Sequence, residues 1–138
     1  MKKVLFLVLT LSVVLAACGN DFVKWSTDDA VAAFEDAGLE VDSVTEMTKD
    51  DYGAAPMKAK KGVRFLIPSL GDDKGGRILV YENEDDLKEM KAYYDDLGKG
   101  SAILFSWTAA KDNILIQING DLPEEKYKKY KKALGSLK

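Results

Sequence analysis

Two pairs of strand-like apolar runs predict two β-hairpins along the chain. The first pair covers residues 63–69 and 77–81, and the turn-rich segment 70–76 joins its two runs. The second pair covers residues 103–108, where Ile, Phe and Trp share one face, and residues 114–119, whose isoleucines alternate with other residues. Because one face of this second pair is strongly apolar, we expect an antiparallel sheet with a single covered side.

Three segments repeat their apolar residues at helical spacing. Ser26 or Thr27 can cap the first helix, and Asn83 can cap the second. The last helix begins at the Asp-Leu-Pro-Glu sequence of residues 121–124. The second helix is expected to end at Gly98. Its core-facing stripe consists of Leu87, Met90, Tyr94 and Leu97.

The order of these elements indicates the fold class. After the first helix the chain reads hairpin, helix, hairpin, helix, with a short strand at residues 39–41 and one helical turn at residues 48–52 as additional features. Hairpins force antiparallel neighbours, and apolar helical stripes need a sheet face to cover. We therefore expect a single α+β domain at residues 26–138. It has an antiparallel sheet of four or more strands from two hairpins, with about three helices packed mainly on one face.

The first eighteen residues follow a different pattern from the rest of the chain. Two lysines precede an apolar run at residues 4–14, and the small residues Ala16 and Ala17 precede Cys18. The run is too short to span a membrane as a permanent helix. Together these features resemble the export signal of bacterial lipoproteins, in which the bond before the cysteine is cut and its sulfur carries diacylglycerol. An ordinary secretory signal with an incidental cysteine is the alternative.

The lipoprotein resemblance implies both a location and an anchor. Residues 1–17 would be a removed signal peptide, and residues 18–25 would be a short lipidated tether on the outer face of the cytoplasmic membrane. Two acyl chains give stable anchoring, at about 0.8 kcal/mol for each buried methylene. Cys18 is then an attachment point rather than a nucleophile, and no cofactor is expected apart from this covalent diacylglycerol.

The composition excludes many kinds of enzyme. The chain has no histidine and one cysteine, which removes Ser-His-Asp and Cys-His nucleophilic sites as well as imidazole and thiolate metal sites. The paired acidic residues lack the spacing of a calcium loop, so we expect no metal site. Because the usual nucleophilic centres are also missing, we expect no catalytic residue and no enzymatic activity. The formal net charge of −3 argues against nucleic-acid binding, which needs clustered lysine and arginine.

A local basic zone interrupts this acidic chain. Residues 57–77 carry six basic residues against two acidic ones. The candidate binding zone consists of Tyr52, Lys58, Lys60, Lys61, Arg64, Lys74 and Arg77. We expect it to contact an envelope protein or an anionic envelope polymer through salt-sensitive interactions. Neutralisation by the acidic first third of the chain is the simpler interpretation.

The main functional hypothesis is a membrane-anchored extracytoplasmic binding module. The alternatives are a small envelope hydrolase with carboxylate or lysine chemistry, and an inhibitor-type or stress-related factor that acts on another envelope protein. The mature domain resembles small Gram-positive lipoproteins of unassigned function, some of them labelled stress proteins. This resemblance rests on residues 49–53, 56–58, 75–77 and 113–121. It supports the location and implies no catalytic residues.

Overall fold

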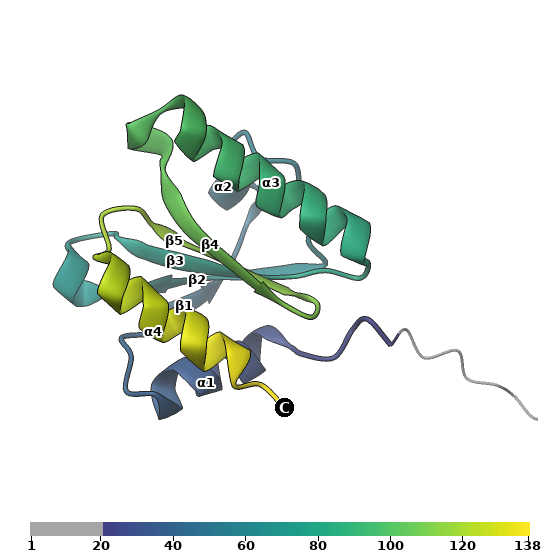
Figure 1. Ribbon diagram of the computed structural model, residues 1–138, viewed down its shortest axis with the longest axis horizontal. Helices are drawn as coiled ribbons and strands as arrows, with labels where there is room; N and C mark the ends of the chain where they lie inside the picture. Colours follow the sequence, from purple (N-terminus) through teal and green to yellow (C-terminus); the bar gives the residue numbers. More distant parts are fainter. Residues whose placement is uncertain (1–20) are drawn as a thin grey trace, which may run out of the picture.

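Five antiparallel strands form the central sheet of the protein, in the order β1-β2-β3-β5-β4 (Figure 1). The computed structural model describes residues 21–138, so the expected signal peptide and Cys18 lie outside the described residues. The strands are β1 (Asp42–Glu46), β2 (Lys61–Leu66), β3 (Gly75–Val80), β4 (Ser106–Lys111) and β5 (Ile114–Asn119). Both predicted hairpins are confirmed, because β2 pairs with β3 and β4 pairs with β5. The strand expected at residues 39–41 lies slightly later, as β1.

Helices cover both faces of this sheet (Figure 1). They are α1 (Thr27–Asp36), α2 (Lys49–Tyr52), α3 (Glu84–Gly100) and α4 (Glu124–Gly135), with 3-10 turns at Pro68–Leu70 and Ala102–Leu104. One face carries α1 and α4, whereas α2 and α3 lie against the other. The α+β class is confirmed, but the helices divide between the faces instead of packing mainly on one. The reason is that β3 and β5 present apolar side chains on both faces.

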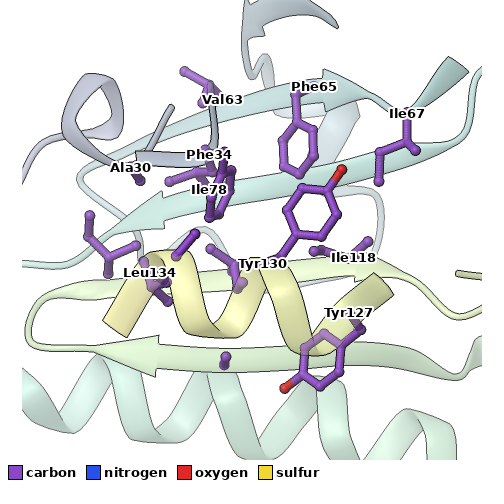
Figure 2. Packing of buried hydrophobic residues seen from close by; sticks show 14 of the residues in the cluster. Ala30, Phe34, Val63, Phe65, Ile67, Ile78, Ile118, Tyr127, Tyr130 and Leu134 are labelled. Carbon is purple, nitrogen blue, oxygen red and sulfur yellow. The ribbon is translucent and has the colours of Figure 1, made fainter. Parts of the chain in front are cut away.

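The rings of Phe34, Phe65 and Tyr130 form the centre of the core on the α1 and α4 face (Figure 2). The centroid of the Tyr130 ring lies 5.2 Å from that of Phe34, in an edge-to-face contact, and 6.1 Å from that of Phe65. The Tyr130 hydroxyl also donates a hydrogen bond to the Glu40 carbonyl oxygen at 2.7 Å. Burial raises the pKa of Tyr130 to about 12, so this hydroxyl remains a donor at neutral pH.

The core on the opposite face is smaller and covers only part of the sheet. Leu79 of β3 and Leu115 of β5 are direct partners and pack with Leu87, Met90 and Tyr94 of α3. Two residues along each strand, the side chains on this same face are Arg77 and Gln117. The apolar layer therefore ends partway along the strands, and a polar surface begins there.

The segment before β4 differs most from the expected structure. β4 begins at Ser106, whereas residues 102–104 form a 3-10 turn that leaves Ile103 93% exposed. The preceding helix α3 continues past Gly98, where it was expected to end. A Cβ atom at Gly98 would lie 3.0 Å from the Phe105 ring. Glycine at this position therefore lets Phe105 approach the helix closely.

Asn113 fixes the N-terminal segment to the turn between β4 and β5. Its Oδ1 accepts hydrogen bonds from the backbone N–H groups of Lys24 at 3.0 Å and Trp25 at 2.9 Å. Its Nδ2 donates to the Trp25 carbonyl oxygen at 2.7 Å, and the whole side chain is buried. Trp25 also donates from Nε1 to Asp112 Oδ2 at 2.9 Å. The described chain thus begins beside this turn (Figure 1).

Candidate functional site

The structure divides the seven residues of the candidate binding zone among separate contacts. Three lysines form ion pairs: Lys58 with Glu89, Lys60 with Glu82, and Lys74 with Asp121. These acids all follow their lysines in the chain, so they do not come from the acidic first third that the simpler interpretation invoked. Lys61 is exposed at the start of β2. The other three members, Tyr52, Arg64 and Arg77, lie around α2 and the polar part of the sheet.

Arg64, Arg77 and Gln117 form a polar row across three strands. Arg64 of β2 is the direct partner of Arg77 on β3, and Arg77 is in turn the partner of Gln117 on β5. Direct partners in an antiparallel sheet have side chains on the same face, here the face that carries α2 and α3. Because two like charges in this arrangement repel each other, the row requires a nearby acid.

Helix α2 supplies that acid through Asp51. Its Oδ1 accepts a hydrogen bond from Arg64 Nη1 at 3.0 Å, and its carbonyl oxygen accepts one from Arg77 Nη2 at 2.8 Å. Asp51 also accepts from the Thr48 backbone N–H at 2.6 Å, which closes a capping box on this single helical turn. The hydrogen bonds from Thr48, with a further contribution from Arg64, lower the pKa of Asp51. Asp51 is therefore ionised at neutral pH and holds both arginines.

Gln117 fixes the orientation of Arg77 from the opposite side. Its Oε1 accepts a hydrogen bond from Arg77 Nη1 at 3.0 Å, and its Nε2 donates to Ser106 Oγ at 3.2 Å. Arg77 is thus held between an acceptor on β5 and an acceptor on α2. A guanidinium has five N–H donors. The two hydrogen bonds described orient Arg77 before a ligand binds, and they use only part of this donor capacity.

We use the name arginine groove for the cavity of about 180 Å³ that lies over this row. Its lining consists of Arg64, Phe65, Asp73, Gly75, Gly76, Arg77, Gln117 and Asn119. A Cβ atom at Gly75 would overlap the Phe65 carbonyl oxygen, and one at Gly76 would lie 2.6 Å from the Phe65 ring. Glycine at both positions therefore lets β2 and β3 pair closely.

A second cavity of about 390 Å³, the apolar pocket, adjoins the arginine groove. The two cavities share Arg77, Gln117 and Asn119. The rest of the apolar pocket is lined by Tyr52, Ala54, Ala55, Tyr93, Tyr94, Leu97, Ile103, Leu104, Phe105 and Ser106. Of these, Ile103, Leu104 and Phe105 are 93%, 52% and 39% exposed. Exposed apolar side chains grouped at one place on a surface are typical of an interaction site.

The Tyr94 hydroxyl stands out in the lining of the apolar pocket. Tyr94 is 2% exposed, and within residues 21–138 its hydroxyl is the one buried side-chain polar atom that has no hydrogen-bond partner of good geometry. Burial raises the pKa of Tyr94, and the nearby positive charge of Arg77 opposes this effect. Burial also raises the pKa of Tyr52. Both phenols are therefore neutral at pH 7 and keep O–H groups that can donate.

The two cavities together provide fixed cationic donors beside an apolar wall. Such an arrangement can orient a small acceptor group and bury an attached apolar group. Among the residues that the structure describes, no three His, Cys, Asp or Glu side chains are grouped so as to hold a metal ion. The same part of the chain contains no helix that is long and apolar enough to cross a membrane.

Comparison with known proteins gave no match to the chain among family models, curated proteins or solved structures.

Of the residues at this site, the candidate binding zone read from the sequence contained only Arg64, Arg77 and Tyr52. Gln117, Ser106 and Tyr94 were not predicted, because their roles depend on which strands and helices meet. One signal was present in the sequence: Gln117 interrupts an apolar strand at the position that faces Arg77. The exposed apolar residues 103–105 were interpreted as part of a strand, which concealed their exposure.

Proposed function

We propose that the protein is a membrane-anchored extracytoplasmic binding module that holds an envelope ligand in the arginine groove. The observation that carries this proposal is the row of Arg64, Arg77 and Gln117, which hydrogen bonds orient in advance and which adjoins the apolar pocket. Preorganised polar groups beside an apolar wall are typical of ligand sites. The ligand is an envelope protein or an anionic envelope polymer, and its binding needs no cofactor.

In this proposal diacylglycerol on Cys18 anchors the protein to the outer face of the cytoplasmic membrane. Asn113 holds Lys24 and Trp25 at the turn between β4 and β5. Asn119 lies at the other end of β5, about 20 Å from Asn113 at roughly 3.4 Å per residue. A short tether would therefore keep the turn near the membrane and direct the arginine groove away from it.

The protonation states around the groove support binding rather than hydrolysis. A general base is most effective when its pKa lies near the working pH. The hydrogen bonds from Thr48 lower the pKa of Asp51, and burial raises the pKa of Tyr52 and Tyr94. These shifts keep the acid ionised and the phenols neutral, which suits fixed hydrogen bonding. The arginines stay charged across the physiological pH range.

A titration followed by NMR tests the proposed site. The mature chain, residues 18–138 with Cys18→Ser, is labelled with ¹⁵N and titrated with a soluble digest of bacterial envelope. We expect chemical-shift changes concentrated at Arg64, Arg77 and Gln117. A Lys60→Gln variant is the matched control, because Lys60 belongs to the basic zone but pairs with Glu82. Shifts confined to other surfaces, or loss of binding in the control, would contradict the site.

The anchor has a separate test. Intact-mass spectrometry of the protein extracted from membranes should show diacylglycerol on Cys18 as the new N-terminal residue. An unmodified Cys18 in the membrane fraction would contradict the anchor without affecting the groove.

A further inference from the structure

The arginine groove has the donor geometry that a carboxylate needs. Arg64 and Arg77 are neighbours across two strands, and each presents a planar fork of N–H donors. Gln117 and Asp51 fix the plane of the Arg77 guanidinium. A planar, bidentate acceptor can bind such a guanidinium with two parallel hydrogen bonds, as carboxylates do.

The charges of the groove favour a monoanion over a dianion. The two arginines are balanced by two carboxylates, Asp51, which pairs with Arg64, and Asp73, which lies in the lining. A carboxylate adds one negative charge to this balanced set, whereas a phosphate monoester adds nearly two. The extra charge of a phosphate monoester would be repelled more strongly by both acids, which favours the carboxylate.

The apolar pocket shows what is attached to that carboxylate. Ile103, Leu104 and Phe105 line it and are partly or largely exposed, so an apolar group placed there would remove their side chains from water. The Tyr94 hydroxyl, buried and without a partner of good geometry in the described chain, provides one more donor beside Arg77. Asn119 lies in the lining of both cavities; its Oδ1 accepts from the Asp121 N–H, and its Nδ2 can donate to a peptide carbonyl.

We infer that the arginine groove and the apolar pocket together bind the free C-terminus of a peptide whose last residue is apolar. The terminal carboxylate lies on Arg77 and Arg64, the last side chain enters the apolar pocket, and the preceding peptide group lies near Asn119. This inference rests on the proposed function and specifies the ligand of the same site.

Calorimetric titration of the full mature chain with Cys18→Ser tests the inference. The probe is the peptide N-acetyl-Ala-Ala-Leu with a free carboxylate, compared with its C-terminal amide. We expect the amide to bind at least about tenfold more weakly, because it cannot accept charge-assisted hydrogen bonds from both arginines. Arg77→Gln should weaken the acid by a similar factor, whereas Lys60→Gln should leave its affinity unchanged.

A second variant tests the apolar pocket without risk to folding. Ile103 is almost fully exposed, so Ile103→Ser leaves the core intact. It should weaken the peptide that ends in Leu severalfold and leave a matched peptide that ends in Gly unaffected. Equal binding of the acid and its amide would overturn the inference. So would inorganic phosphate or hexanoate that binds as tightly as the peptide, since either result removes the need for a peptide C-terminus.

The outcomes also separate this inference from the proposed function. If the envelope digest shifts Arg77 and Gln117 in the NMR titration but the peptides do not bind, the peptide C-terminus is the wrong ligand and the groove remains the site. If neither the digest nor the peptides act on these residues, both are overturned.

Discussion

Replacement of Asn113 by alanine should destabilise the fold by about 2–4 kcal/mol. The side chain makes three hydrogen bonds to the backbone of Lys24 and Trp25, and each contributes a net of about 1 kcal/mol. Because Lys24 is exposed, water can replace part of the lost hydrogen bonding. The fully buried Asn113 side chain leaves a cavity, which adds to the loss of stability. The expected decrease in Tm is roughly 10 °C for a domain of this size.

Urea unfolding of the wild type and the variant measures this difference directly. The matched control is Asn119→Ala at the far end of β5, where the side chain accepts a hydrogen bond from the Asp121 N–H at 2.9 Å and the loss should be only about 1 kcal/mol. Hydrogen exchange provides a second readout, because the amides of Lys24 and Trp25 should exchange faster only in Asn113→Ala. An equal loss of stability in both variants, with unchanged exchange at residues 24 and 25, would refute the reasoning.

Three further predictions concern the sheet, the core and the groove. Gly76→Ala should lower the free energy of unfolding by about 1–3 kcal/mol, because the new methyl group would press on the Phe65 ring; a neutral result in urea unfolding would argue against the close β2–β3 pairing. Tyr130→Phe should cost about 1 kcal/mol, because the hydroxyl loses its bond to the Glu40 carbonyl, and an unchanged midpoint would show that this bond contributes nothing. Folding lowers the pKa of Asp51. The stabilisation from its contacts is therefore complete above the unfolded pKa of about 3.9, and it is lost as the pH falls through the lower pKa of the folded chain. NMR shifts of Arg64, the partner of the Asp51 carboxylate, should therefore stay constant from about pH 7 to pH 5 and change only below about pH 4, and Asp51→Asn should remove that change; a transition near neutral pH would contradict this assignment.

Most of the fold could be predicted from local patterns. Strand-like runs separated by turn signals predicted both hairpins, and Asn83 caps α3 as expected, with its Oδ1 accepting from the Asp86 N–H at 2.9 Å. The helices on both faces were missed because the strands were interpreted as half-buried. Residues 77–81 and 114–116 are almost continuously apolar, which is the pattern of strands covered on two sides.

The candidate site was harder to predict, because its charges depend on contacts between distant segments. Lys58 and Lys74 looked equivalent to Arg77 in the sequence, yet they pair with Glu89 and Asp121, which lie 31 and 47 positions away. No local pattern indicates which lysine meets an acid across the fold. Arg64 and Arg77 differ from these lysines because they lie within paired strands of the sheet. Asp51 of α2 contacts both of them from one side only.

Photo-crosslinking in intact cells tests most directly whether the groove is occupied where the protein works. A photoreactive amino acid replaces Ile103 beside the groove, or Lys24 beside the tether as the control. We expect a crosslinked product from position 103 that disappears when Arg77→Gln is added, and no Arg77-dependent product from position 24. A product at position 103 that persists without Arg77, or the same product from both positions, would contradict binding in the arginine groove.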